Sequence, residues 1–286
     1  MNTVQQRIRA SCQHVFALAG EACRRVAARL EPAPDSTLSA EVKELLARNA
    51  VFRNCHTGKR CFVIGNGPSL ATQDLTPLGN EITFAMSGFW KHPILESWQP
   101  TYYCISDRLF FDRSEPMKEF FRQLNQRIHG AAFFVPAHAA GQVHSDRILP
   151  PDRSYYVKFH DAARSVDLTS CILTPQSVSQ LCIEIALYMG CSPIYLLGLD
   201  HDWLAHRGMH RNFYEGKTVD NHAQAHGDLA KMSYRIDMEC QLKLWQRYET
   251  IHDLARDRKL IVENATNGGF LDVFPRARYE DVVGSR

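Results

Sequence analysis

Residues 59–70 read Lys-Arg-Cys-Phe-Val-Ile-Gly-Asn-Gly-Pro-Ser-Leu, and this stretch decides the fold. Its apolar run, residues 61–64, ends at Gly65 and is typical of a short buried strand. Glycines at positions 65 and 67 let the backbone turn tightly and approach an anion, and free N–H groups at the start of a following helix can hold phosphate. On spacing alone, the segment is either a phosphate-binding turn or a plain connection from strand to helix.

The turn differs from two well-known glycine-rich motifs. Leu70 stands where the dinucleotide-binding fingerprint has its third glycine, and no Gly-Lys-Ser/Thr follows as in a Walker P-loop. The side-chain amide of Asn66 adds a group that could contact a base, a ribose or a phosphate. If the turn binds a nucleotide, the residues that hold it are Gly65, Asn66, Gly67, Pro68 and Ser69.

Strands and helices are expected to alternate along the next 220 residues or so. Further apolar, strand-like segments occupy residues 82–86, 101–105, 131–135, 194–199 and 260–262. Helical stretches between them cover residues 115–128, 177–189 and 231–258. Such alternation predicts an α/β fold whose mostly parallel, doubly wound sheet carries helices on both faces. Ligands bind such sheets at the carboxyl ends of the strands, so residues that follow a strand are the candidates for function.

An N-terminal helical segment, residues 1–57, is expected to precede the nucleotide-binding catalytic domain, residues 58–286. Residues 1–30 carry five arginines against the single acidic residue Glu21, and a Pro-rich break at 31–36 separates them from a second helix over 38–53. The first helix is expected either to pack on the domain or a partner subunit, or to lie on an anionic membrane surface.

The composition predicts a cytoplasmic globular protein. Of the 286 residues, 45% are hydrophobic and 22% charged, which is enough apolar material for a core. The net charge of +2 gives no general attraction to nucleic acid. No apolar run approaches the roughly 20 residues of a membrane-spanning helix, and the N-terminus lacks the pattern of a secretory signal. Nine cysteines without a C-x-x-C pair argue against a disulfide framework or a zinc knuckle and indicate a reducing compartment.

Histidines are concentrated just after the strand that ends near Leu199. This segment, about residues 201–230, contains His201, His206, His210, His222 and His226. Its glycines and polar composition suggest a lid that closes over a site. Histidine titrates near neutrality, so one of these residues could take a proton from an attacking hydroxyl. We single out His210 as the candidate base, although a solvated or merely hydrogen-bonded histidine is the alternative.

Two metal sites are conceivable in the same segment. Asp200-His201-Asp202 is a D-x-D pattern, which many nucleotide-sugar transferases use to hold Mg²⁺ or Mn²⁺ against a diphosphate. In the alternative interpretation, Asp200 orders the loop by accepting hydrogen bonds from backbone N–H groups. His206 and His210 would share a helix face suited to zinc, but the intervening Gly208 disfavours a helix there.

Several polar residues near other strand or helix ends are further candidates. Asp107 follows a strand and would either bind substrate hydroxyls or fix its loop through an ion pair. Residues 174–177 precede a helix whose N-terminus could hold an anion, or their hydroxyls only cap that helix. The candidate nucleotide-binding residues from these segments are Ser87, Asp107, Gln176, Ser177, Asn264 and Thr266. For Asn264 and Thr266, a structural role in the turn is an equal alternative.

Five pieces of the sequence carry a resemblance to a known superfamily. They are residues 65–70, 100–107, 182–200, His210 with Phe213-Tyr214, and residues 264–266. Over roughly residues 58–280 the chain resembles the bacterial sialyltransferases of glycosyltransferase family 42 and the superfamily that includes the 6-hydroxymethylpterin diphosphokinase-like proteins.

The resemblance implies a Rossmann-like sheet that binds a nucleotide at the Gly65 turn. By similarity, Asn66 contacts a CMP-sugar donor, His210 is the general base, and Tyr214 stabilises the leaving phosphate. Asp200 of the D-x-D pattern is the third candidate catalytic residue. The chain departs from the family pattern at Ser87, because the sialyltransferases have a second donor-binding asparagine there.

The preferred hypothesis is a glycosyltransferase of bacterial surface-glycan biosynthesis that uses a nucleotide-activated donor, preferably a CMP-linked acidic sugar. Its acceptor is a glycan or a lipid-linked glycan. A basic N-terminal helix would suit a lipid-linked acceptor, because it would hold the enzyme at the inner membrane face. The mechanism requires no cofactor, and Mg²⁺ or Mn²⁺ enters only if Asp200 and Asp202 bind it. The alternatives are an ATP-dependent diphosphokinase that acts on a pterin-like alcohol, with Mg²⁺ on Asp107, Asp200 and Asp202, and a non-catalytic nucleotide-binding scaffold.

Overall fold

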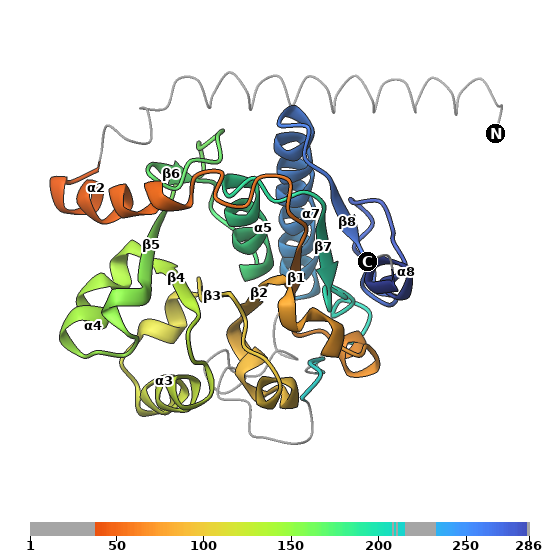
Figure 1. The fold of residues 1–286 in the computed structure, drawn as a ribbon, viewed down its shortest axis with the longest axis horizontal. Helices are drawn as coiled ribbons and strands as arrows, with labels where there is room; N and C mark the ends of the chain where they lie inside the picture. The colour runs from red at the N-terminus through yellow and green to blue at the C-terminus, as the bar shows by residue number, and fades with distance from the viewer. Residues whose placement is uncertain (1–37, 208, 210, 215–232, 285–286) are drawn as a thin grey trace.

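A parallel β-sheet forms the centre of the computed structural model, which describes residues 38–207, 209, 211–214 and 233–284 (Figure 1). In these residues the strand order is β6-β5-β4-β3-β2-β1-β7-β8. The strands are β1 (Cys61–Ile64), β2 (Ile82–Met86), β3 (Tyr102–Cys104), β4 (Ala132–Pro136), β5 (Ser154–Phe159), β6 (Cys171–Ile172), β7 (Ile194–Leu197) and β8 (Val262–Asn264). The helices are α2 (Ala40–Ala47), α3 (Glu115–Arg127), α4 (Ala140–Ser145), α5 (Val178–Tyr188), α7 (Tyr234–Asp257) and α8 (Tyr279–Gly284).

The direction in which the chain builds the sheet changes at β1. Cys61 at the start of β1 is opposite Ile82 of β2 on one side and Ile194 of β7 on the other. The chain runs outward from β1 to β6 and then returns to place β7 on the free side of β1. Every neighbouring pair of strands is parallel, so the predicted Rossmann-like α/β architecture is confirmed. In open α/β sheets, such a switch point has a crevice at the carboxyl ends of the strands, where ligands bind.

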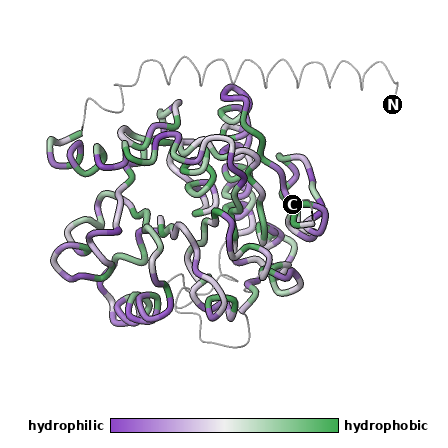
Figure 2. Tube along the Cα trace, in the orientation of Figure 1, coloured by the Kyte–Doolittle hydropathy of each residue, from purple (hydrophilic) through white to green (hydrophobic). Residues whose placement is uncertain are grey.

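Two hydrophobic cores lie on opposite faces of the sheet, as alternation along a strand requires. In β1, Cys61 and Val63 join the core under α5 and α7, whereas Phe62 and Ile64 join the core that includes α3. Figure 2 shows hydrophobic and hydrophilic residues mixed along α3, which covers the sheet with one face only. Helix α5 is instead buried from Ser179 to Tyr188, so both ends of this helix are fixed by packing.

The segment before β1 is packed on the sheet. The expected helix over 38–53 is α2 followed by a 3-10 turn, residues 48–52. The buried Asn49 donates hydrogen bonds to the carbonyl oxygens of Tyr156 (2.7 Å) and Leu168 (2.8 Å). Phe52 stacks edge-on against Tyr155 with ring centroids 4.5 Å apart. The expected basic helix over residues 1–30 lies outside the described residues.

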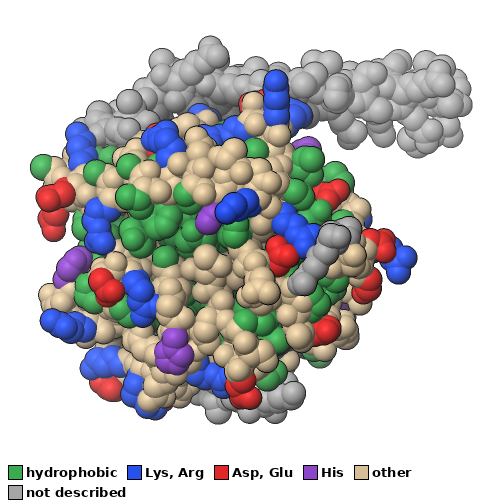
Figure 3. Space-filling view, in the orientation of Figure 1, with side chains coloured by type: hydrophobic (Ala, Val, Ile, Leu, Met, Phe, Trp, Pro, Cys, Tyr) green, Lys and Arg blue, Asp and Glu red, His purple; other side chains and the backbone are tan. Residues whose placement is uncertain are grey.

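Two properties of the described residues bear on contacts with membranes or nucleic acids, namely surface charge and helix hydrophobicity. On the face in view in Figure 3, Lys and Arg side chains are spread among acidic and polar groups without forming one patch. Within residues 38–207 and 233–284, no helix combines the length and the apolar character that crossing a bilayer requires. The seven cysteines in the described part of the chain are free thiols.

Helix α5 also contains one buried carboxyl group. Glu184 is 3% exposed, and its Oε2 atom has no hydrogen-bond partner among the described residues. Burial raises the pKa of Glu184 to about 8, against the opposing attraction of Arg247 on α7. The side chain is therefore mainly protonated at neutral pH in the folded protein.

Candidate active site

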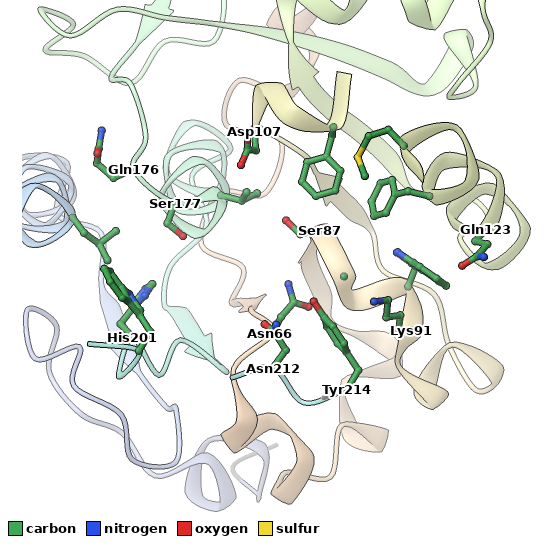
Figure 4. A pocket seen from close by; sticks show the side chains of 18 of the residues that line it. Asn66, Ser87, Lys91, Asp107, Gln123, Gln176, Ser177, His201, Asn212 and Tyr214 are labelled. Atoms are coloured by element: carbon green, nitrogen blue, oxygen red, sulfur yellow. The ribbon is translucent and has the colours of Figure 1, made fainter. Parts of the chain in front are cut away.

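Two adjoining cavities open at the β1/β7 switch point, with volumes of about 780 Å³ and about 310 Å³. Figure 4 shows side chains that line the larger one. Both are lined by Asn66, Ser87, Ser177 and His201. The larger cavity is also lined by Asp107, Gln176 and Tyr214, and the smaller by Gly65, Gly67, Asp200 and Asp202. The fold thus brings most of the sequence-predicted site residues to one place, and volumes of this size suit a nucleotide or sugar.

The glycine turn after β1 is fastened to the turn after β7. The N–H group of Gly67 donates to the carbonyl oxygen of Gly198 (2.8 Å), and the N–H group of Ser69 donates to Asp200 Oδ1 (3.2 Å). A Cβ atom at Gly67 would overlap the Asp200 carboxylate, while its φ of −63° is open to any residue. Glycine is therefore needed at position 67 for space. A phosphate at this turn would compete with these hydrogen bonds, so other groups of the cavity must contribute to nucleotide binding.

Both carboxylates of the D-x-D pattern are held by protein groups. Asp200 Oδ2 accepts a hydrogen bond from Ser69 Oγ (2.7 Å), and burial raises the pKa of Asp200 although the Ser69 hydrogen bonds oppose the shift. Asp202 forms an ion pair with Arg211 (2.7 Å) and lies 3.5 Å from His206 Nε2. Among the residues that the structure describes, no group of three His, Cys, Asp or Glu side chains could hold a metal ion. In the described residues, Asp200 orders the loop through its hydrogen bonds with Ser69, and Asp202 is engaged by Arg211.

Asn66 presents an unused amide oxygen to the site. The side-chain Nδ2 of Asn66 donates a hydrogen bond to the backbone carbonyl oxygen of Met86 (3.2 Å). The backbone carbonyl oxygen of Asn66 accepts a hydrogen bond from the N–H group of Phe213 (2.9 Å). Its Oδ1 atom is buried and has no partner within the described residues. Because Asn66 lines both cavities, this oxygen can accept a hydrogen bond from a ligand bound there.

Aromatic and cationic side chains form the other side of the larger cavity. Tyr214 covers Gly88 so closely that a Cβ there would lie 2.6 Å from the tyrosine hydroxyl. Lys91 Nζ lies 4.0 Å from the Tyr214 ring centroid, a cation–π contact. Trp90 and Phe120 continue this wall.

His201 is a site residue that motif matching did not single out. It adopts a left-handed φ of +46°, which is uncommon for histidine. Its Nε2 lies 2.7 Å from the Tyr248 hydroxyl, which lies 2.6 Å from Ser179 Oγ, and that atom lies 2.7 Å from Ser177 Oγ. Burial lowers the pKa of His201 to about 4 and raises the pKa of Tyr248. The sequence feature that could have identified His201 as a site residue is its position directly after Asp200.

The structure gives other predicted residues different surroundings. Asn264 and Thr266 do not line the two cavities: Asn264 Nδ2 donates to the carbonyl oxygen of Leu271 (2.9 Å), and Thr266 Oγ1 accepts from the N–H group of Leu199 (3.1 Å). Both have the structural turn role that was the alternative interpretation. Asp107 caps a 3-10 turn by accepting from the N–H group of Leu109 (2.9 Å). Pro68 begins the 3-10 turn over 68–72.

Part of the expected lid lies beyond the described residues. His210, Gly208 and residues 215–232, which include His222 and His226, are outside them. The prediction that His210 is the base therefore stays a prediction.

A family model described as 6-hydroxymethylpterin diphosphokinase MptE-like matches residues 36–205. The chain belongs to this MptE-like family. The matched region runs from before α2 to the residues after β7, so it includes Asn66, Ser177 and His201. Tyr214 and Tyr248 lie outside it. No protein with a curated description matches the sequence.

The MptE-like chain is also similar to solved sialyltransferases from Campylobacter jejuni. The sialyltransferase CstII in complex with CMP-3FNeuAc shares 14% identity at a TM-score of 0.45, with 76% of this chain and 86% of CstII covered. The monofunctional alpha-2,3-sialyltransferase Cst-I shares 15% identity at a TM-score of 0.45, with 77% and 80% covered.

Proposed function

We propose that this MptE-like protein is a glycosyltransferase that moves a sugar from a nucleotide-activated donor to a hydroxyl group of a glycan or lipid-linked glycan. The observation that carries the proposal is the composition of the switch-point cavities. Amide, hydroxyl, imidazole and aromatic groups line them, while the carboxylates of Asp200 and Asp202 are held by Ser69 and Arg211. Such a site can bind a nucleotide and a sugar without a metal ion.

The nucleotide would occupy the part of the site shared by both cavities. The unpaired Oδ1 of Asn66 can accept from a base amino group or a ribose hydroxyl. Ser177 is the N-cap of α5, and the positive end of an eleven-residue helix favours a phosphate. A CMP-linked donor carries one phosphate, which one helix N-terminus can hold.

The sugar would lie in the larger cavity. Trp90, Phe110 and Phe120 give it an apolar wall on which the ring and its substituents can pack. Lys91, which also lines this cavity, supplies positive charge for the carboxylate of an acidic sugar. Tyr214, which lines this cavity, would contact the leaving phosphate. A histidine would take the proton of the acceptor hydroxyl, and His210 is the candidate that the sequence offers.

The cellular setting is part of the same proposal. We expect a cytoplasmic enzyme of bacterial surface-glycan biosynthesis whose basic residues 1–30 contact the inner membrane face. Deleting residues 1–35 should then lower the fraction of protein bound to anionic vesicles. An unchanged bound fraction would contradict the membrane role and leave the transferase proposal in place.

The family description supports a second candidate, diphosphoryl transfer from ATP to a pterin-like alcohol. This reaction needs Mg²⁺ ligands, for which Asp107, Asp200 and Asp202 are the candidates. The engagement of Asp200 and Asp202 by protein groups counts against it. A non-catalytic, nucleotide-binding scaffold is the third possibility.

A nucleotide-binding panel discriminates among these functions. Melting temperatures are measured with CMP, CDP, UDP, GDP or ATP, each with Mg²⁺, Mn²⁺ or EDTA. A ligand at 100 times its dissociation constant stabilises the fold by about 2.7 kcal/mol. We expect CMP to raise the melting temperature in EDTA, and Asn66→Ala to abolish the shift. Asn267→Ala, which changes an exposed asparagine near the same edge, should leave it intact.

A turnover assay with a CMP-linked acidic sugar and glycan acceptors follows the binding panel. Release of CMP that depends on the acceptor would support transfer. A shift that occurs only with ATP and Mg²⁺ would select the diphosphokinase, and CMP binding without turnover would select the scaffold. No shift with any nucleotide would refute nucleotide binding at this site.

A further inference from the structure

We propose that His201, Tyr248, Ser179 and Ser177 form a proton relay that takes the acceptor's proton at one end and delivers a proton to the departing phosphate at the other. The inference rests on the proposed glycosyl transfer and names His201, in place of His210, as the group that takes the acceptor's proton. It also gives a function to Tyr248 of α7, which no sequence motif identifies.

The relay is continuous, and only its ends reach the site. The three links measure 2.7 Å from His201 Nε2 to the Tyr248 hydroxyl, 2.6 Å onward to Ser179 Oγ, and 2.7 Å to Ser177 Oγ. His201 and Ser177 line both cavities, whereas Tyr248 and Ser179 are completely buried. Water therefore has no access to the middle of the chain, and a proton that enters at one end can leave only at the other.

Each member can both give and receive a hydrogen bond, so the chain can reverse its direction. At the start, His201 Nε2–H donates to Tyr248, Tyr248 to Ser179, and Ser179 to Ser177, whose hydroxyl donates to a phosphate oxygen. The second ring nitrogen of His201, Nδ1, is then an acceptor for the sugar hydroxyl.

The transfer balances in one concerted step. The acceptor O–H bond breaks, its proton goes to Nδ1, and its electron pair forms the bond to the anomeric carbon. The bond from that carbon to the phosphate oxygen breaks, and its electron pair stays on the phosphate. Each relay proton moves one position along, and the phosphate receives the proton of Ser177. After the products leave, water supplies a proton at Ser177, each relay proton moves back one position so that Nε2 regains its own, and Nδ1 releases its proton to water.

The surroundings favour a neutral relay over buried ions. Burial lowers the pKa of His201 to about 4, with only Asp202 opposing the shift, and burial raises the pKa of Tyr248. Both groups are therefore neutral near pH 7. A histidine with so low a pKa is a weak isolated base, but simultaneous release of a proton at Ser177 removes the need to hold a charge.

Packing fixes the histidine in a conformation that it would otherwise rarely adopt. Its φ of +46° costs about 1 kcal/mol or more. The ring is held beside Tyr248, with centroids 5.4 Å apart, and beside Trp245, with centroids 6.1 Å apart. Strain of this kind persists where the surrounding structure enforces it, and it is concentrated at functional sites.

The test compares Tyr248→Phe with Tyr188→Phe in the full chain. Both substitutions remove one hydroxyl from a buried tyrosine, but Tyr188 lies at the opposite end of α5 and outside the relay. Turnover of a CMP-linked acidic sugar is measured in mixtures of H₂O and D₂O. We expect Tyr248→Phe to lower kcat roughly 100-fold with little change in the donor KM. The wild type should show a curved dependence on deuterium fraction, since several protons move, and Tyr248→Phe a linear one.

Each other outcome has a definite meaning. A Tyr248→Phe variant as active as Tyr188→Phe overturns the relay and leaves the transferase proposal standing. A slow variant that keeps the curved isotope dependence shows that Tyr248 only positions His201, which also overturns the relay. If Tyr248→Phe fails to fold, Ser179→Ala takes its place under the same criteria. A wild-type protein that neither binds CMP nor transfers sugar overturns the proposed function, and the relay with it.

Discussion

Replacing Glu184 with glutamine should change how the stability of the fold depends on pH. The folded protein holds this buried side chain protonated, with its pKa raised from 4.5 to about 8. In the unfolded chain the carboxyl group loses its proton above pH 4.5. Between these values the folded state binds one proton more than the unfolded state, so the free energy of unfolding falls as pH rises. Glutamine has no proton to lose and removes this dependence.

The magnitude follows from the size of the shift. One proton difference corresponds to about 1.4 kcal/mol per pH unit. From pH 5 to pH 7 the stability of Glu184→Gln should therefore rise by about 2.7 kcal/mol relative to the wild type. Urea denaturation at pH 5, 6 and 7 measures the difference, and contributions from all other titrating groups cancel because both proteins share them.

Glu249→Gln is the matched control, because Glu249 is an exposed carboxylate on the neighbouring α7. Its stability should parallel that of the wild type at all three pH values. Parallel curves for Glu184→Gln and the wild type would refute the reasoning, since they would mean that Glu184 titrates alike in the folded and unfolded states.

Three further perturbations test the packing of the molecule. Gly67→Ala should lower the free energy of unfolding by about 2 kcal/mol and weaken CMP binding, whereas Gly141→Ala, where a Cβ meets no atom within 4 Å, should do neither in urea and titration experiments. Asn49→Ala leaves two buried carbonyl groups unpaired and should cost about 2–4 kcal/mol in urea denaturation; a loss below 0.5 kcal/mol would contradict this. His92 and His201 have pKa values lowered to about 4, so both side chains stay neutral in the folded protein down to that pH. In the unfolded chain they take up protons near pH 6.5, so the free energy of unfolding should fall as the pH is lowered from 6.5 to 4. His92→Gln should remove part of that fall, and an unchanged pH dependence would show that His92 titrates normally.

Most of the sheet could be predicted because its central strands are buried on both faces. Such strands appear in the sequence as short apolar runs, and β1, β2, β4 and β7 lie within one or two residues of the predicted segments. Strand β5 was missed because Ser154–Phe159 mixes an exposed lysine and tyrosine hydroxyls with its apolar residues. Strand β6 has only two residues, too few for any periodic signal.

The site was predictable where side chains directly follow a strand, or directly precede a helix as Gln176 and Ser177 precede α5. Asn66 and Asp200 lie at the switch point for this reason, but their positions did not reveal whether they face the cavity or the neighbouring turn. Asn264 also follows a strand, yet its amide turns inward to Leu271. His201 and Tyr248 are 47 residues apart, and a tyrosine on an amphipathic helix resembles any other core residue. Only the folded structure shows that two such distant residues are in contact.

The close fit of Gly67 against the Asp200 carboxylate has a consequence for how this sequence can change over evolutionary time. A Cβ atom at position 67 would overlap the Asp200 carboxylate and would also lie 2.7 Å from the backbone carbonyl oxygen of Gly198. A shorter residue at position 200 removes the first clash, whereas the second is relieved only if the turns after β1 and β7 move apart. Substitution at position 67 therefore depends on changes elsewhere in the two turns, which is epistasis between them. In homologous chains we expect a residue larger than glycine at position 67 only where position 200 is no longer an aspartate and the two turns lie farther apart.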